Sequence, residues 1–403
     1  MRQLLRIPSL LTVVAMLLAA CGTGETDTSA SAKATGSIAA SEPAASEPAA
    51  SEPTAADDCG PEALGGTIPV EFQLQWVPQA QFAGYFAAQD LNFYADAGLD
   101  VTFLDGGPTI APQQVVAADD GPEFGEGWVP KVLVAREEGA DLVNIAQVFQ
   151  RSGTLEVSWK DSGITEPADW AGKKIGAWGF GNEFEVLAAA RQAGLEDTDY
   201  ERVTQDFNME LLLNREIDAA EAMIYNELAQ LLETEDPETG ELYSLDDLSI
   251  IDFNEVGSAM LQDHIMARES WLASDTDGTP NEQIAICFLR ASFEGWMHCR
   301  DNADECVDIV LDQGTILGEG HQHWMMNEIN ALIWPSPDGI GMLDPDLWQQ
   351  TVDISLEFDI LTEEPTDGAF RTDLAEAALA GIDGDTTGDD FEKAEVEVTP
   401  GGE

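Results

Sequence analysis

The chain has 403 residues, of which 77 are Asp or Glu and only 17 are Lys or Arg, so its formal net charge is -60. A surface this acidic repels nucleic acid and anionic lipid headgroups, which excludes a nucleic-acid-binding protein. We interpret the charge as adaptation to a salty medium, where screening shortens the repulsion between like charges. A calcium site is not expected, because no Asp-rich loop with ordered ligand spacing occurs.

The first 20 residues have the pattern of a bacterial lipoprotein signal peptide. Arg2 and Arg6 precede an apolar stretch, 7–20, which is too short for a comfortable membrane span. The stretch ends in Leu-Ala-Ala-Cys21, a lipobox pattern that predicts cleavage before Cys21 and acylation of its thiol. The alternative is an ordinary signal peptide with a chance cysteine. We therefore expect a protein anchored by lipid to the extracytoplasmic face of the cell membrane.

Two segments have compositions that predict disorder, residues 21–66 and residues 381–403. The first is an acidic Ser/Glu/Pro/Ala linker in which Ser-Glu-Pro recurs three times, and it has nothing with which to form a core. The second is an acidic, Gly-rich tail that is expected to be frayed. A long folded body lies between them.

Strand and helix patterns alternate along this body. Strands are predicted at 70–76, 99–104, 123–125, 142–149, 154–160, 174–178, 219–225, 250–253 and 263–267. Helices are predicted at 79–97, which Gly98 ends, and at 110–118, 129–138, 183–193, 209–215, 281–299, 303–312, 320–332 and 345–358. Such alternation requires parallel strands. We therefore predict two α/β lobes around a ligand cleft, with lobe one at 67–157 plus 262–380 and lobe two at 158–261.

Four further cysteines fall in or near the folded body. Cys59, Cys287, Cys299 and Cys306 are an even number, which in an exported protein favours disulfides. Cys299 and Cys306 flank the turn between two predicted helices and are a candidate pair. A zinc site is less favoured, because no CxxC pair occurs.

The carboxyl ends of the strands are where α/β sheets bind small molecules, so we expect the ligand there. The predicted ligand-binding residues are Trp76, Gln79, Gln81, Tyr85, Trp128, Trp178, Gly179, Gly181, Asn182, Tyr225, Asn226 and Glu227. Their rings would stack on a flat heteroaromatic ligand, and their amides and carboxylate would bond its edge. The turn 179–182 would offer backbone N–H groups to an anion or carbonyl.

Other interpretations of these residues remain open. Tyr85 lies between Phe82 and Phe86 in a predicted helix, so it fits the core as well as the cleft. Glu227 fits a solvated helix start, where a carboxylate complements the helix dipole. No metal is expected: His321 and His323 are two residues apart, which places them on different faces of a helix.

Several runs resemble a known family, the SsuA/THI5-like (NMT1 family) substrate-binding proteins. The run 74–88 (Leu-Gln-Trp-Val-Pro-Gln-Ala-Gln-Phe-Ala-Gly-Tyr-Phe-Ala-Ala) and the run 92–101 are similar to the opening of these proteins. Residues 163–164, 170–176 and 216–219 fit the same pattern. The resemblance covers about 67–375 and implies a type II periplasmic-binding-protein fold.

The resemblance also implies a function. Such proteins are lipoproteins of ABC transporters, and this one would capture a small heteroaromatic solute for import through permease and ATPase subunits. A thiamine-precursor pyrimidine, hydroxymethylpyrimidine or formylaminopyrimidine, fits the aromatic strand ends best; riboflavin or an alkylsulfonate is the alternative. The resemblance implies a monomer with no cofactor.

Enzymes of thiamine-pyrimidine synthesis share this fold and are the alternative class. They use a lysine–histidine pair on the helix after the third strand, together with a cysteine-rich iron motif. The matching stretch here, Gly127-Trp-Val-Pro-Lys131, lacks the histidine, and no cysteine cluster follows Phe253. The resemblance therefore favours a binding protein over an enzyme. A sensory lipoprotein without a permease is a third interpretation.

Overall fold

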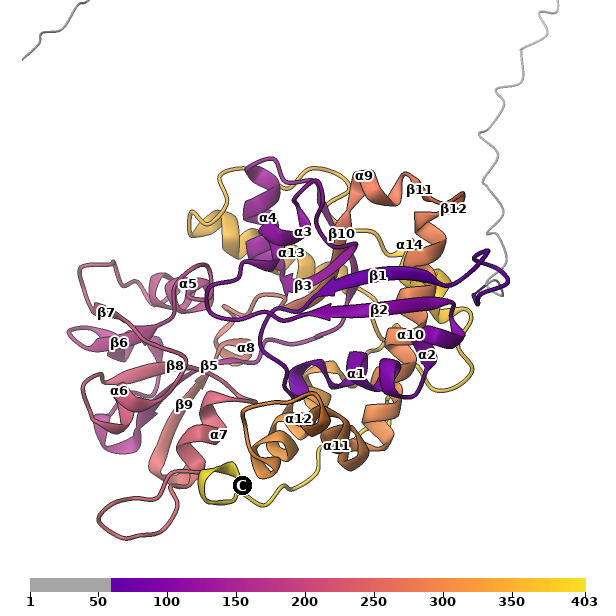
Figure 1. The fold of residues 1–403 in the computed structure, drawn as a ribbon. Helices are drawn as coiled ribbons and strands as arrows, with labels where there is room; N and C mark the ends of the chain where they lie inside the picture. The colour runs from indigo at the N-terminus through magenta and orange to yellow at the C-terminus, as the bar shows by residue number, and fades with distance from the viewer. Residues whose placement is uncertain (1–58) are drawn as a thin grey trace, which may run out of the picture. The chain divides into compact units, whose positions relative to one another are not determined.

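The computed structural model describes residues 59–403, which contain two separate five-stranded sheets (Figure 1). The sheet of strand order β2-β1-β3-β10-β4 and its helices form what we call lobe one, and the sheet of order β7-β6-β8-β5-β9 forms lobe two. This confirms the predicted α/β class with two sheets. The signal peptide, Cys21 and most of the predicted linker lie outside the described residues. Within 59–403, no helix has the length and apolar content needed to cross a membrane.

Lobe one combines parallel and antiparallel strands. Its strands are β1 (Ile68–Gln73), β2 (Leu99–Leu104), β3 (Phe124–Trp128), β4 (Leu142–Gln147) and β10 (Asp263–Arg268). β1 pairs in parallel with β2 and β3, and β10 runs antiparallel between β3 and β4. Since β10 follows all the strands of lobe two in the chain, the sheet of lobe one is completed only after lobe two has been made.

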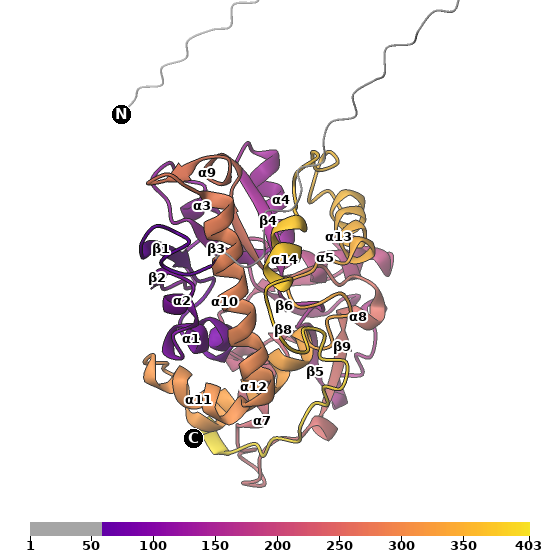
Figure 2. The same cartoon turned by 90° about the vertical axis from the view of Figure 1, so that its right-hand side faces the viewer.

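Helices of different lengths pack around this sheet. They are η1 (Ala80–Phe82), α1 (Ala83–Asp90), α2 (Phe93–Asp96), α3 (Pro112–Val116), α4 (Val129–Glu137), α9 (Glu269–Leu272), α10 (Asn281–Asp301), α11 (Ala303–Asp312), α12 (Glu319–Ile333), α13 (Pro345–Glu357) and α14 (Asp373–Leu379), with a hairpin of β11 (Asp275–Thr276) and β12 (Thr279–Pro280). α10 packs between α1 and α14 (Figure 2). Its Phe288 stacks on Phe124 of β3, with ring centroids 4.2 Å apart, which joins helix and sheet into one core.

The predicted helix 79–97 is broken into three pieces. Asn92 adopts a left-handed conformation (φ 66°) that no helix interior accommodates, so α1 ends before it and α2 begins after it. Gly98 (φ 82°) follows the last helical turn, as predicted.

Lobe two is smaller. Its strands are β5 (Thr154–Trp159), β6 (Lys174–Ala177), β7 (Glu201–Thr204), β8 (Ala219–Met223) and β9 (Leu248–Asp252). Its helices are η2 (Lys160–Ser162), η3 (Pro167–Trp170), α5 (Phe184–Gln192), α6 (Glu210–Leu213), α7 (Glu227–Leu232), η4 (Leu245–Asp247) and α8 (Phe253–Val256). All of β5 pairs with β8 and β9, so the predicted lobe boundary at 157/158 cuts a strand and moves back to before Thr154.

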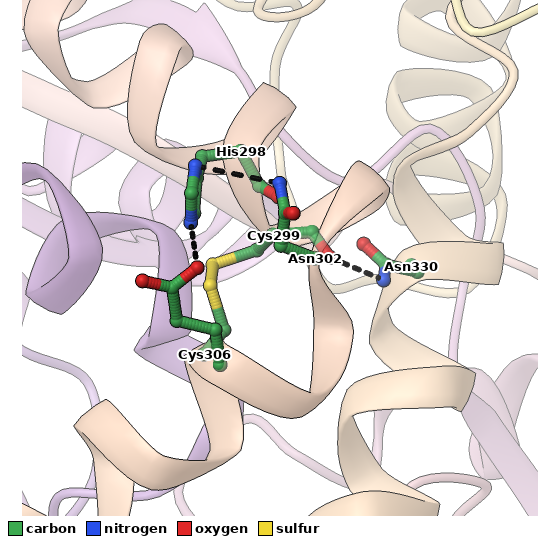
Figure 3. Close-up of a disulfide and its surroundings, with 6 residues drawn as sticks. His298, Cys299, Asn302, Cys306 and Asn330 are labelled. Carbon is green, nitrogen blue, oxygen red and sulfur yellow. Dashed lines mark hydrogen bonds and ion pairs between the residues drawn. A yellow bond between two sulfur atoms is a disulfide. The ribbon is translucent and has the colours of Figure 1, made fainter.

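Two disulfides fasten the helices of lobe one. Cys299 pairs with Cys306 across the turn between α10 and α11, as predicted (Figure 3). Asn330 of α12 donates a hydrogen bond to the carbonyl of Cys299, which adds a third helix to this junction. Cys59 pairs with Cys287 of α10. The folded body therefore includes residues 59–66, which were predicted to be linker, and Leu64 is buried in its core.

Residues 381–403 are ordered against the protein, which corrects the prediction of a disordered tail. Lys393 forms an ion pair of 2.5 Å with the buried Glu328 of α12. The backbone N–H and C=O of Ala394 both form hydrogen bonds with the side-chain amide of Asn327. The final turn, η5 (Pro400–Gly402), lies beside α7 and α12 at the end marked C in Figure 1. Composition predicted disorder because these contacts are made by backbone groups, by one lysine and by isolated apolar side chains such as Phe391 and Val398, which form no hydrophobic pattern along the chain.

Candidate functional site

A cleft of about 740 Å³ lies between the two lobes and is open to solvent. Nine of the twelve predicted ligand-binding residues line it: Trp76, Gln79, Gln81, Trp128, Trp178, Asn182, Tyr225, Asn226 and Glu227. The first four come from lobe one and the others from lobe two. The carboxyl ends of the strands therefore supply residues to both walls of the cleft.

Three predicted residues do not line the cleft. Tyr85 is fully buried in the core of lobe one, where it packs edge-to-face on Phe72 and Trp296, because α1 turns this side of the helix toward the sheet. Gly179 and Gly181 are not among the lining residues. The N–H of Gly181 donates to the carboxylate of Glu183, so it is not available to an anion.

Other lining residues were missed by sequence reasoning. Gln75, Lys131, Met223 and Phe207 line the cleft, together with Phe180 and the loop 107–113. Phe207 lies in the loop between β7 and α6. It was missed because the sequence has no strand pattern that predicts β7. In the sequence, Lys131 drew attention only through the comparison of the stretch 127–131 with the enzymes of thiamine-pyrimidine synthesis.

Aromatic rings from both lobes meet in the cleft. The ring of Phe207 lies 4.5 Å from the ring of Trp76 in lobe one. The ring of Phe207 also stacks on the ring of Trp178, with the ring centroids 5.5 Å apart and an angle of 21° between the ring planes. The three rings form a continuous apolar surface, which suits the face of a flat ligand.

Lys131 is the one cationic side chain among the lining residues of the described chain. Its ammonium lies 4.5 Å from the ring centre of Trp128 and donates to Oδ1 of Asn182 in lobe two. Burial lowers the pKa of Lys131 to about 8, although Asp263, Glu221 and Glu183 oppose the shift. The cation is thus already engaged by a ring and an amide.

On the lobe-two side, a chain of hydrogen bonds ends at the cleft. His321 of α12 contacts the carboxylate of Glu233 through Nδ1 (2.9 Å) and Oδ1 of Asn226 through Nε2 (3.0 Å). Nδ2 of Asn226 donates to Glu227, whose other oxygen accepts from the N–H of Met223. Burial raises the pKa of Glu227 to about 7.

Trp178 is held through its backbone while its indole N–H stays unused. Its backbone N–H donates to the buried Glu221 at 2.6 Å. The indole Nε1 is buried without a hydrogen-bond partner in residues 59–403. On the lobe-one wall, Oε1 of Gln75 is a buried acceptor that likewise has no partner in this part of the chain. Buried polar atoms are normally paired, so these two are suited to a bound solute.

The described residues contain no group of three or more His, Cys, Asp or Glu side chains placed to hold a metal ion. None of the four histidines lines the cleft. What the cleft offers is an aromatic surface, several amides, one carboxyl (Glu227) and the ammonium of Lys131, which are groups that bind and orient a solute.

Residues 79–306, more than half of the chain, match the family described as NMT1/THI5 like. The chain belongs to the NMT1/THI5-like family. Most of both cleft walls falls within the matched residues.

Relatives of known name include both binding proteins and enzymes. The chain is 25% identical to the riboflavin-binding protein RibY of Chloroflexus aurantiacus, covering 70% of this chain and 78% of that one. It is 24% identical to the formylaminopyrimidine-binding protein of Halalkalibacterium halodurans, covering 60% and 69%. It is 26% identical to the 4-amino-5-hydroxymethyl-2-methylpyrimidine phosphate synthase THI11 of Saccharomyces cerevisiae, but over only 38% of this chain and 45% of the enzyme.

Solved structures establish the fold. The ligand-binding component of an ABC-type import system from Staphylococcus aureus superposes with a TM-score of 0.56 at 10% identity, covering 77% of this chain and 99% of that one. The periplasmic aliphatic sulphonate binding protein SsuA of Escherichia coli gives 0.52 at 15% identity, covering 74% and 89%. The predicted type II periplasmic-binding-protein fold is therefore confirmed.

Proposed function

We propose that this protein is the solute-binding component of an ABC importer and that it captures a small heteroaromatic solute in the cleft between its lobes. The observation that carries the proposal is the junction of Trp76, Phe207 and Trp178, three rings from both lobes beside the amides of the cleft and the carboxyl of Glu227. A flat ring would stack on this surface while its edge bonds the polar groups.

A thiamine-precursor pyrimidine is the solute class that these groups favour. The unpaired indole N–H of Trp178 needs an acceptor, which a ring nitrogen supplies, and the unpaired oxygen of Gln75 needs a donor, which an amino group supplies. A named relative that binds formylaminopyrimidine supports this class, and a relative that binds riboflavin supports the broader class of heteroaromatic solutes.

An alkylsulfonate fits less well. Its permanent negative charge would meet Glu227 and the field of the buried Asp263, with Lys131 as the lone cationic group lining the cleft of the described chain. Because Lys131 is already bonded to Asn182, a sulfonate would have to break that contact.

The proposal assigns the protein a carrier role and not catalysis. The synthases match less than half of this chain, and Lys131 has no histidine beside it in the cleft of residues 59–403. Purified protein that carries bound pyridoxal phosphate, seen by its absorbance, would overturn this part. We further propose that Cys21 carries a lipid, that the folded body faces the outside of the cell membrane as a monomer, and that permease and ATPase subunits are its partners.

Tryptophan fluorescence tests the binding role, since three tryptophans line the cleft. Titration with formylaminopyrimidine, hydroxymethylpyrimidine, riboflavin and an alkanesulfonate should give saturable quenching with a heteroaromatic solute. Trp178→Ala should weaken that binding at least tenfold. Trp348→Phe, a change in the distant contact with Phe370, should leave it unchanged. Saturable binding of the sulfonate alone would refute the heteroaromatic proposal.

A further inference from the structure

A single carboxylate lies behind the lobe-one wall of the cleft. Asp263 is the first residue of β10 and is completely buried. In the sheet it stands opposite Trp128, the last residue of β3. The sequence predicts a strand at 263–267 but assigns Asp263 no role.

Three cleft-lining side chains from three different segments donate to this carboxylate. Trp128 Nε1 donates to Oδ1 at 2.7 Å, and Gln81 Nε2 of η1 donates to Oδ2 at 2.6 Å. Gln75 Nε2, from the loop after β1, makes a longer contact of 3.4 Å with Oδ1. The carboxylate of Asp263 is therefore the common hydrogen-bond acceptor of Trp128, Gln81 and Gln75.

The carboxylate also decides which end of each amide faces the cleft. A carboxylate only accepts hydrogen bonds, so both glutamines must turn their NH2 groups toward Asp263. The oxygen of Gln81 then accepts from Nε2 of Gln79 at 2.7 Å. The oxygen of Gln75 is left as the buried, unpaired acceptor. We propose that Asp263 is the positioning residue of the lobe-one wall, which fixes Trp128 as a stacking surface and obliges the solute to donate a hydrogen bond to Gln75.

This inference rests on the proposed function for its consequence, but the arrangement can be tested without a ligand. Burial raises the pKa of Asp263 to about 6, although the donors Gln81 and Trp128 and the ammonium of Lys131 lower it. Protonation would turn one acceptor oxygen into a donor and release part of the cluster. Asp263 should therefore hold its donors above pH 6 and lose them below.

Other ionisable groups surround the cluster and must be separated from Asp263. Glu126 of β3, Tyr85 of α1, Tyr225 after β8 and Lys131 of α4 all interact with it electrostatically. Glu126 is the matched control, since it is as deeply buried in the same sheet but bonds Tyr85 and no lining residue.

The experiment follows the 15N indole resonance of Trp128 in the full chain, assigned with Trp128→Phe. In the wild type and in Glu126→Gln this resonance should be protected from hydrogen exchange and should titrate with a midpoint near pH 6. In Asp263→Asn it should lose the titration and exchange at least tenfold faster. If Asp263→Asn does not fold, the wild-type indole N–H of Trp128 still decides, because hydrogen exchange at pH 7.5 as fast as that of a solvent-exposed indole would mean that its bond to Asp263 is not formed and would overturn the proposal.

The second measurement is the dissociation constant for formylaminopyrimidine at pH 7.5. Asp263→Asn should raise it at least tenfold, and Glu126→Gln should change it less than threefold. Wild-type binding that Asp263→Asn leaves intact overturns the positioning role alone. If the wild type binds none of the heteroaromatic probes, the proposed function fails. The ligand-free measurements on the Trp128 indole then still decide the role of Asp263.

Discussion

Lys131 in lobe one donates a hydrogen bond of 2.5 Å to Asn182 in lobe two, so a polar contact between two lining residues links the lobes across the cleft. Hydrogen bonds to charged groups contribute about 1.5–3 kcal/mol, which corresponds to roughly tenfold or more in a rate. Lys131→Met should therefore speed solute release about tenfold, measured by stopped-flow fluorescence. Lys160→Met, an exposed lysine outside the cleft, should leave the rate unchanged. An unaltered rate in Lys131→Met would mean that the contact does not hold the lobes closed.

Phe207 joins the rings of the two lobes and should contribute to affinity. Aromatic pairs add about 0.5–1.5 kcal/mol beyond the area that they bury, so Phe207→Ala should weaken solute binding up to about tenfold. The dissociation constant by fluorescence titration measures this. Ile316→Ala removes an exposed apolar side chain outside the cleft and should have no effect. Tighter binding in Phe207→Ala would instead identify Phe207 as a side chain that competes with the solute.

The two disulfides should differ in their contribution to stability. Cys59–Cys287 spans 228 residues and Cys299–Cys306 spans seven. Loop-closure entropy gives upper limits of about 5 kcal/mol for the long loop and ~2.5 kcal/mol for the short one. Cys59→Ala/Cys287→Ala should thus lower the free energy of unfolding more than Cys299→Ala/Cys306→Ala, in denaturant titrations. The reverse order would show that the first bridge is not structural.

Glu185 should make stability depend on pH. Its buried carboxyl accepts from Ser152 and from the N–H of Met260, yet burial raises its pKa to about 7 from a usual value of 4.5. A raised pKa in the folded state gives a stabilisation that is complete below pH 4.5 and is lost as pH rises through 7.

The free energy of unfolding of the wild type, relative to Glu185→Gln, should therefore fall between pH 4.5 and 7.5, by roughly 3 kcal/mol at most. Denaturant titrations of both proteins at several pH values measure this difference. Glu364→Gln removes an exposed carboxylate and should track the wild type. A difference that is flat with pH would contradict the buried, protonated state.

The C-terminal turn offers a matched pair of glycines. Gly401 and Gly402 both have positive φ (69° and 71°), so alanine at either position meets the same backbone strain. Only at Gly402 would the added methyl lie 2.8 Å from Cβ of His321. Gly402→Ala should destabilise the protein by about 1–3 kcal/mol more than Gly401→Ala and speed hydrogen exchange in α7 and α12. Equal effects would show that the turn is not seated there.

The order of elements was predictable where the hydrophobic pattern is strong. β2 and α11 have the predicted bounds, because they alternate or repeat apolar residues against one core. β7 was missed: Glu201, Arg202 and Thr204 are exposed, so this edge strand has no buried face to generate a pattern. α7 was missed because its apolar residues continue directly from those of β8.

The site was predictable where position along a strand decides it. Trp128 and Trp178 stand at strand ends of the two different sheets, which is where α/β sheets bind their ligands. Phe207 and Lys131 depend on how the lobes face each other, which no local pattern encodes. Asp263 escaped notice for another reason, since its importance comes from three partners that are 135 to 188 residues away in the chain.

The bond between Cys59 and Cys287 also has a mechanical consequence. It joins the first described residue to the middle of α10, the longest helix of lobe one. Any pull on the chain that precedes Cys59 is therefore carried by a covalent link into the core of lobe one. Lobe two contains neither cysteine of this bond, so tension on the preceding chain does not act on it directly.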